Sequence, residues 1–310
     1  MDSTKSGDTA IEVLQPLVAC GWCDAALPRA DTGAGYALAH CQACGAYTTV
    51  PQPSDDELDN AYGPWYRPAE GRFGRLGDGL LRFTRSRLAR RVDQLSPPGP
   101  VLDVGAGDGT LVGALIARGR TALGLERHAH GEHIRAAELE SIDGEWAAIT
   151  MWHSLEHLRS AGTTAAHAAD LLAPHGVLIV AAPNPDSLQA RVFGRRWFGW
   201  DLPRHLVHLP ADTLIAGLEA RGLSVERVSH WRGGLIVFGW LQGLVKLLPG
   251  APDLADAIRV PGARAQPLSS GRRIATIASA VLLWPLAAAC GAGEAMLRRG
   301  GTIYVVARHG

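Results

Sequence analysis

A short apolar run stops abruptly at three closely spaced glycines in the first half of the chain. Residues 101–110 read Val-Leu-Asp-Val-Gly-Ala-Gly-Asp-Gly-Thr, and the apolar stretch 111–117 follows. This pattern predicts a β-strand, a tight turn and the start of a helix. Glycines let the backbone approach a ligand closely, and a helix N-terminus adds unpaired N–H groups and a partial positive charge. A dinucleotide site needs G-x-G-x-x-G, whereas here the third glycine is Gly109 and Thr110 follows, so the turn predicts an α/β domain with a different polar ligand.

The composition is that of a globular protein of about two domains. The chain has 310 residues, 47% of them hydrophobic and 19% charged, which is enough to form a packed core. A formal net charge of zero argues against bulk nucleic acid as the main partner. Residues 1–9 are polar and lack the apolar core of a signal peptide, so we expect a cytoplasmic protein in a reducing compartment. The oligomeric state does not follow from the sequence.

Four of the five cysteines form two pairs with metal-ligand spacing. Cys20 and Cys23, then Cys41 and Cys44, give C-x2-C, seventeen residues and C-x2-C. This spacing predicts one tetrahedral zinc ion held by four thiolates, which stabilises a module too small to fold through its own core. Because four thiolates close the coordination sphere, we expect a structural zinc; a redox dithiol pair is the alternative. Cys290 lies in an apolar stretch and is expected to be a core residue.

Two segments carry a resemblance to a known family. The G-x-G-x-G turn, with Asp103 two residues before it, resembles the first motif of class I methyltransferases that use S-adenosylmethionine. The paired cysteines and the segment up to Tyr62 and Tyr66 resemble the zinc-ribbon module that precedes the methyltransferase domain in a group of bacterial small-molecule and sugar methyltransferases. The resemblance implies a cofactor site that includes Asp103, Gly105, Ala106, Gly107 and Gly109.

The segment between the ribbon and the glycine turn is rich in arginine. Between residues 67 and 91, eight arginines stand against Glu70 and Asp78. The later part predicts an amphipathic helix, which ends before the proline-rich run 96–100. This helix either has a solvated basic face or meets phosphates, on anionic lipid or on a nucleotide-linked substrate. The expected domains are an N-terminal tail (1–17), a zinc ribbon (18–66), a basic linker helix (67–98) and a methyltransferase domain (99–310).

An acidic residue follows the next predicted strand. That strand, 121–125, ends at Glu126, about twenty residues past the glycine turn. A carboxylate in this place accepts hydrogen bonds from both ribose hydroxyls, so Glu126 is the predicted ribose ligand, although the same residue would suit a nicotinamide cofactor. His128, His130 and His133 follow in a segment of loop composition. We expect a solvated loop there, with a metal site as the alternative.

A third predicted strand passes into a polar motif. The run 146–152 leads to Trp152-His153-Ser154-Leu155-Glu156-His157. Ligands of open α/β sheets bind at the carboxyl ends of the strands, so His153 and His157 lie on the predicted binding edge. The motif resembles the post-strand segment of the methyltransferase group that includes quinone O-methyltransferases and natural-product enzymes, which implies cofactor contacts for Trp152 and His153. The predicted adenine contacts are Glu138 and Leu139.

A second group of histidines comes later in the chain. Residues 195–209 are dense in aromatic and basic residues and contain Pro203-Arg204-His205-Leu206-Val207-His208. In the resembling group, a similar Pro-x-His-Leu-x-His stretch closes the acceptor pocket, which implies that His205 and His208 face the acceptor. On composition alone, each is equally an interface residue. The loop 182–185, Ala-Pro-Asn-Pro, is not the N-P-P-aromatic loop of amino-group methylating enzymes, which counts against methylation of a base nitrogen.

An apolar insertion separates the last two predicted strands. Strands at 223–228 and 302–307 would ordinarily pair through a short turn, but residues 232–300 intervene, with apolar stretches at 235–248 and 274–293. Twenty apolar residues could just span a bilayer, yet a single span would put the two strands on opposite sides of a membrane. We expect paired helices that cover the active site or lie in a membrane interface; a true span and internal packing are the alternatives.

The sequence therefore predicts a class I methyltransferase with a seven-stranded, mostly parallel, Rossmann-like sheet, an N-terminal zinc ribbon and a helical insertion before the last strand. The expected reaction moves the methyl group of S-adenosylmethionine to a hydroxyl of a small apolar, lipid-linked or sugar-type acceptor in a biosynthetic pathway. The candidate bases are His153 and His157, then His205 and His208. We expect a cytoplasmic protein with peripheral contact to the membrane. The alternatives are a zinc-ribbon ribosomal RNA methyltransferase and a non-catalytic membrane-associated binding module.

Overall fold

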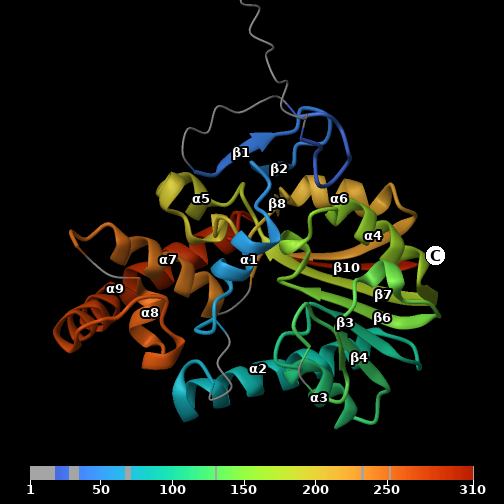
Figure 1. Cartoon of the computed structure of the whole chain (residues 1–310), viewed down its shortest axis with the longest axis horizontal. Coiled ribbons are helices and arrows are strands. Elements are labelled where there is room, and N and C mark those ends of the chain that lie inside the picture. The colour runs from blue at the N-terminus through green and yellow to red at the C-terminus, as the bar shows by residue number, and fades with distance from the viewer. Residues whose placement is uncertain are drawn as a thin grey trace, which may run out of the picture.

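The computed structural model describes residues 18–27, 35–66, 71–129, 131–231, 234–250 and 253–309, so the expected tail at 1–17 lies outside the described residues. Its centre is a seven-stranded sheet in the order β5-β4-β3-β6-β7-β10-β9 (Figure 1). The strands are β3 (Val101–Val104), β4 (Ala122–Leu125), β5 (Ile134–Arg135), β6 (Trp146–Trp152), β7 (Leu172–Pro183), β9 (Leu223–Ser229) and β10 (Thr302–His309). Only β10 runs antiparallel to its neighbours in this sheet. The predicted seven-stranded, mostly parallel sheet is confirmed.

Helices cover both faces of this sheet (Figure 1). Those on one face are α2 (Gly74–Leu95) and α3 (Thr110–Ile116), and those on the other are α4 (Ala161–Asp170) and α6 (Ala211–Glu219). All four residues of β3 are buried, because a parallel strand between two helical layers has no solvent face. Leu102 and Ile149 pack toward α4 and α6, whereas Val101 and Ala148 pack toward α2 and α3. The sheet therefore separates two hydrophobic cores, and the ends of its strands remain available for functional side chains.

The cysteine-rich segment packs against the α4 and α6 face. Its strands form a second sheet, β1-β2-β8, from β1 (Ala37–His40), β2 (Tyr47–Val50) and β8 (Val207–His208). The indole of Trp22 is buried and lies 4.5 Å from the guanidinium of Arg221. The amide of Gly162, near the start of α4, donates to the carbonyl of Gly21 at 3.0 Å. The ribbon and the central sheet therefore share one hydrophobic core.

A short helix leads from the ribbon to the sheet. Helix α1 (Asp55–Ala61) begins after Ser54, whose hydroxyl accepts the Glu57 amide, while the Glu57 carboxylate accepts the Ser54 amide at 2.7 Å. This reciprocal pair satisfies two N–H groups that a helix start leaves without partners. The remaining short elements are α5 (Leu188–Phe193) and 3-10 helices at Leu139–Ser141, Leu155–His157, Gly194–Arg196, Phe198–Trp200 and Pro261–Ala263.

The insertion folds into helices beside the sheet, at the left of Figure 1. They are α7 (Gly234–Lys246), α8 (Leu254–Ile258) and α9 (Ser270–Met296). Helices α7 and α9 contact each other, and the buried carboxylate of Glu294 accepts hydrogen bonds from Gln189 on α5 and from Trp240 on α7. Among the described helices, α9 is long and apolar enough to cross a membrane, and only 22% of its apolar window is buried inside the protein.

Candidate functional site

Three glycines make the turn between β3 and α3 possible. Gly105, Gly107 and Gly109 have φ values of 78°, 66° and 70°, a region that other residues rarely adopt. A Cβ on Gly105 would lie 2.4 Å from the Cβ of Ser154, so the turn passes close to the segment after β6. The amide of Gly107 donates to Oε2 of Glu126 at 2.7 Å. The turn and the predicted ribose ligand therefore lie side by side.

Asp103 lies within β3, before the turn. Its carboxylate is buried and accepts the hydroxyl of Thr150 on β6 at 2.5 Å. Burial raises the pKa of Asp103 to about 6, although the Thr150 hydrogen bond acts in the opposite direction. Ala106 is also buried, and it packs against Gly124 of β4. Asp103 and Ala106, which were predicted to contact the cofactor, are therefore buried residues that pack behind the turn.

A cleft of about 1400 Å³ opens at the carboxyl ends of the parallel strands. This volume exceeds the roughly 300–1,000 Å³ of typical small-molecule sites, so it has room for a cofactor and an acceptor together. The predicted residues that line it are Gly105, Gly107, Glu126, Glu138, Leu139, His153 and His157. Asp103, Ala106, Gly109, Trp152, His205 and His208 do not line it. Trp152 instead packs between Tyr304 and the guanidinium of Arg85.

His153 and Glu156 form a hydrogen-bonded pair at the edge of the cleft. His153 has a positive φ of 55°, which is uncommon for a residue with a side chain. Its Nδ1 lies 3.2 Å from Oε1 of Glu156, which is 2% exposed. Burial alone would raise the pKa of Glu156, but the hydrogen bond from His153 and the neighbouring imidazoles lower it to about 2. The carboxylate is therefore ionised and accepts the Nδ1 proton, which leaves the lone pair of His153 on Nε2.

His157 lies beside this pair and faces the cleft. Its Nδ1 is 2.9 Å from the carbonyl oxygen of Arg204 and 2.7 Å from the hydroxyl of Tyr62, which also lines the cleft. Burial and the adjacent His205 lower the pKa of His157 to about 4. The imidazole is therefore neutral at physiological pH.

The two later histidines lie behind the wall of the cleft. Nδ1 of His205 is 2.8 Å from the carbonyl of Gly199, and Nε2 of His208 is 3.2 Å from the hydroxyl of Thr49 on β2. Burial lowers the pKa of His208 to about 3. His208 is part of β8 and so belongs to the contact between the ribbon and the sheet. The geometry thus separates His153 and His157, which line the cleft, from His205 and His208, which do not.

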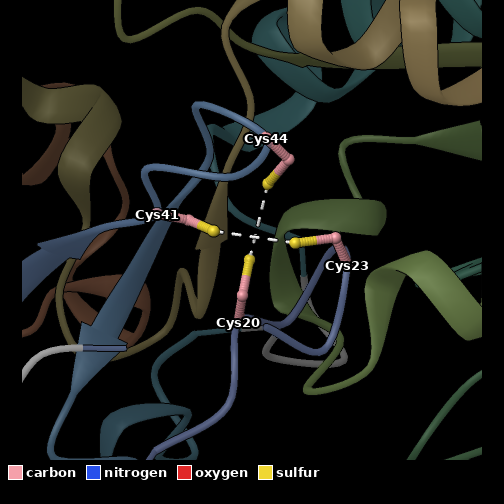
Figure 2. A group of neighbouring side chains, drawn as sticks. All are labelled: Cys20, Cys23, Cys41 and Cys44. Carbon is pink, nitrogen blue, oxygen red and sulfur yellow. Dashed lines mark hydrogen bonds between the residues drawn. The ribbon is translucent and has the colours of Figure 1, made fainter. Parts of the chain in front are cut away.

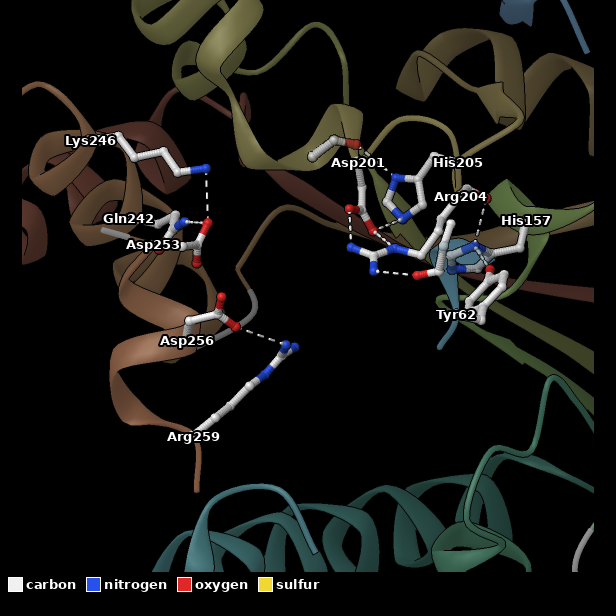
Figure 3. A network of polar contacts seen from close by, with 12 residues as sticks. Tyr62, His157, Asp201, Arg204, His205, Gln242, Lys246, Asp253, Asp256 and Arg259 are labelled. Carbon is white, nitrogen blue, oxygen red and sulfur yellow. Dashed lines mark hydrogen bonds and ion pairs between the residues drawn. The ribbon is translucent and has the colours of Figure 1, made fainter. Parts of the chain in front are cut away.

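Arg204 ties the loop before β8 to the aromatic segment after α1 (Figure 3). Its guanidinium bonds to the carboxylate of Asp201 and donates to the carbonyl of Ala61 at 3.2 Å. The same group lies 4.9 Å from the ring of Tyr66 and 5.5 Å from that of Trp65. The arginine is held in place by its ion pair, its hydrogen bonds and the attraction between its positive charge and the faces of the aromatic rings. One wall of the cleft is therefore held by residues from distant parts of the chain.

The four paired cysteines converge on one point (Figure 2). The Sγ atoms of Cys20 and Cys44 are 3.7 Å apart, and those of Cys23 and Cys41 are 3.6 Å apart. Tetrahedral zinc with bonds of about 2.3 Å places its sulfur ligands roughly 3.8 Å apart, whereas a disulfide needs about 2.05 Å. The four cysteines fit a zinc ribbon.

The strand order defines the class of protein. A parallel Rossmann-like sheet with its last strand inserted antiparallel between two others, and a glycine turn after the central strand, is the fold of class I methyltransferases. Residues 80–228 match the family described as a methyltransferase domain. No protein with a curated function matches the sequence. Residues 80–228 therefore form a methyltransferase domain, of the S-adenosylmethionine-dependent class.

Solved structures with a similar fold are distant in sequence. An S-adenosylmethionine-dependent methyltransferase from Archaeoglobus fulgidus is 16% identical, with a TM-score of 0.44, over 73% of this chain and 93% of that one. Magnesium protoporphyrin IX methyltransferase from Synechocystis, with bound S-adenosylhomocysteine, is 20% identical with a TM-score of 0.38, over 47% and 75%. A sarcosine dimethylglycine methyltransferase homologue from Galdieria sulphuraria is 12% identical with a TM-score of 0.46, over 74% and 84%.

Sequence reasoning missed part of the cleft. The additional lining residues from α1, α2 and the segments beside them include Leu58, Tyr62, Tyr66, Arg72, Asp78, Leu81 and Arg82. The sequence signal for these residues was the group of aromatic residues before residue 67. They do not recur at the spacing of an apolar helix face, so core packing does not explain them. None of the described residues of the insertion lines the cleft.

Proposed function

We propose that this methyltransferase methylates a hydroxyl oxygen of a small acceptor held in the cleft. The observation that carries the proposal is the arrangement of the glycine turn, Glu126 and the His153–Glu156 pair around one cleft. The turn would hold the methionine end of S-adenosylmethionine through its backbone N–H groups. Glu126 would accept the ribose hydroxyls, while Glu138 and Leu139 would contact the adenine.

The chemistry follows from the charge state of the His153–Glu156 pair. Nε2 of His153 has no hydrogen-bond partner among the described residues, and Glu156 holds the ring through Nδ1. As the acceptor oxygen attacks the methyl carbon, the O–CH3 bond forms, the S–CH3 bond breaks, and Nε2 of His153 takes the hydroxyl proton. Positioning two reactants can be worth roughly 7–11 kcal/mol, and a base adds about 10² to 10⁴ in rate. His157 is the second candidate base.

The zinc is proposed to be structural. Four thiolates leave no open coordination position, so the ion would hold the two knuckles and, through them, β1 and β2. Zinc would thereby also support β8, which pairs with β2 at Tyr47 and Thr48.

Helix α9 supports a peripheral location at the cytoplasmic face of a membrane. Ile274, Val281 and Leu282 are at least 68% exposed. Several large apolar side chains exposed on one helix indicate an interaction surface, because their contact with water is unfavourable. Exposed arginines stand at both ends of the helix, at Arg272 and Arg299 among others. A helix with exposed apolar side chains between basic ends is typical of helices that lie in the interface of an anionic membrane. At that interface the protein would be close to an apolar or lipid-linked acceptor. Co-sedimentation with anionic vesicles tests this location, and a Leu282→Glu variant that binds as well as wild type would contradict it.

The methyl-transfer proposal is tested with labelled cofactor. Purified protein is titrated calorimetrically with S-adenosylmethionine, and transfer of its labelled methyl group into fractionated cell extract is followed. Glu126→Ala should weaken cofactor binding, whereas Glu132→Ala, an exposed acidic residue in the next loop, should not. His153→Ala should bind the cofactor and slow transfer by about 10² or more. Label that appears only on nitrogen or carbon would overturn O-methylation.

A further inference from the structure

A carboxylate and two imidazoles from separate loops converge beside the cleft. Glu156 and His157 belong to the 3-10 helix after β6, and His205 lies in the loop before β8. One metal-binding atom from each residue lies within 4.8 Å of the other two. The amide of Leu206 donates to the backbone carbonyl of Glu156 at 2.7 Å. The backbone itself therefore holds the two loops, and the three side chains, together.

The hydrogen bonds of the two rings leave one lone pair on each. Nδ1 of His157 is 2.9 Å from the carbonyl of Arg204, and Nδ1 of His205 is 2.8 Å from the carbonyl of Gly199. A carbonyl oxygen can only accept, so each Nδ1 carries a proton, and in the neutral form of each ring Nε2 keeps its lone pair. Metal-binding histidines commonly show this arrangement, because an N–H donated to a carbonyl fixes the tautomer and orients the ring.

Glu156 has a buried carboxylate of which one oxygen has no hydrogen-bond partner among the described residues. Oε1 contacts Nδ1 of His153, but Oε2 has no hydrogen-bond partner among the described residues, and the residue is 2% exposed. An unpaired oxygen on a buried carboxylate is costly, and nearly all buried polar groups in proteins are paired. Nε2 of His205 lies 3.7 Å from Oδ2 of the Asp201 carboxylate, so it does not supply the missing donor to Glu156. A cation between the three side chains would satisfy Oε2 of Glu156.

We infer that Glu156, His157 and His205 bind a second metal ion, a divalent transition metal of which Zn²⁺ is the first candidate. Two imidazoles favour zinc and its neighbours over Mg²⁺ and Ca²⁺, which prefer oxygen ligands. Ligand atoms at about 2.1 Å from a tetrahedral ion lie roughly 3.4 Å apart, so small side-chain rotations close the present separations. This set differs from the four-cysteine site because three ligands leave a coordination position open.

The open position gives the ion a role in the reaction proposed above, on which this step rests. His157 lines the cleft, so a hydroxyl oxygen of the acceptor can become the next ligand. A bound divalent ion lowers the pKa of an oxygen ligand strongly, as zinc does for water, from 15.7 to about 7. The hydroxyl would then pass its proton to His153 more readily. Glu156 would serve both partners, His153 through Oε1 and the ion through Oε2.

Metal titration of the zinc-loaded full chain tests the site. Loosely bound metal is removed with a weak chelator, and Co²⁺ is then added while absorbance and heat are recorded. Wild type should bind one further equivalent of Co²⁺ without the intense thiolate-to-metal charge-transfer band that cysteine ligands give. Glu156→Gln and His205→Ala should each weaken this binding by ~100-fold or more. The control is His133→Ala, an exposed histidine in the loop after β4, which should leave the affinity unchanged.

The outcomes separate the site from the proposed function. No further equivalent in wild type, a thiolate band, or unchanged affinity in both variants overturns the site. If a variant fails to fold by circular dichroism, the other variant and the wild-type spectrum still decide. Full-rate methyl transfer in metal-stripped protein refutes the role of the ion and leaves the function intact. Metal binding without transfer to any extract fraction refutes the function and leaves the site intact.

Discussion

Replacing Gly162 by alanine should loosen the ribbon from the catalytic domain. A Cβ at this position would lie 1.9 Å from the backbone carbonyl oxygen of Trp22, so the two segments must separate by about 1.5 Å to reach normal contact. That displacement strains the core by roughly 1–3 kcal/mol. It also weakens the hydrogen bonds from Gly162 to Gly21 and from Arg221 to Trp22, each worth about 1 kcal/mol. We therefore expect a loss of about 3–5 kcal/mol in the free energy of unfolding.

Urea unfolding and the rate of zinc release to a coloured chelator measure this change. Gly162→Ala should lower the unfolding free energy and release the proposed zinc ion faster than wild type. Gly113→Ala is the matched control, since Gly113 is also helical but a Cβ there meets nothing within 4 Å. It should stabilise the protein by about 0.5–1 kcal/mol, because alanine favours the helix. A Gly162→Ala protein within 1 kcal/mol of wild type, with unchanged zinc release, would show that the close packing of ribbon and helix α4 is wrong.

Three further perturbations probe other parts of the molecule. Because burial raises the pKa of Asp103 to about 6, folding stability should fall by roughly 3 kcal/mol as pH rises from about 3 to 7, and Asp103→Asn should abolish that fall in pH-dependent denaturant melts. Glu294→Ala should lower the melting temperature, since it leaves buried donors on α5 and α7 without an acceptor, whereas an exposed change such as Glu132→Ala should not. Thr49→Val removes the hydroxyl that donates to the His205 carbonyl at 2.6 Å, so methyl transfer should slow while calorimetric affinity for S-adenosylmethionine stays constant; equal slowing and loss of affinity would contradict that separation.

The sheet could be predicted because its signals are local. The glycine turn, Glu126 at the end of β4 and the polar motif after β6 each follow a buried strand, and the carboxyl ends of parallel strands meet at one edge. The paired apolar stretches likewise predicted helices, and α7 and α9 are in contact. These features depend on residues within a few turns of one another in sequence.

The remaining parts depend on contacts between distant segments. Nothing near His205 and His208 in the sequence shows that one lies behind the wall of the cleft and the other pairs with the ribbon. The contact of Tyr62 with His157 joins residues 95 positions apart. The buried carboxylate of Glu156 has its pKa lowered first by His153 and then by His157 and His205, and the approach of His205 depends on the folded chain. The residue pattern and spacing do not show which distant segments come into contact.

Strand β2 is one of the connections between the ribbon and the site. Thr49 on β2 bonds to the His205 carbonyl through its hydroxyl and to the Leu206 carbonyl through its amide, at 2.6 and 2.9 Å. The four-cysteine knuckles hold β2, and β2 thereby holds the loop that brings His205 to Glu156. A zinc ion at the cysteines would thus stabilise the geometry of the second cluster without touching it. This link gives a physical reason for a ribbon ahead of the catalytic sheet, because the short β8 offers only two residues of its own for pairing.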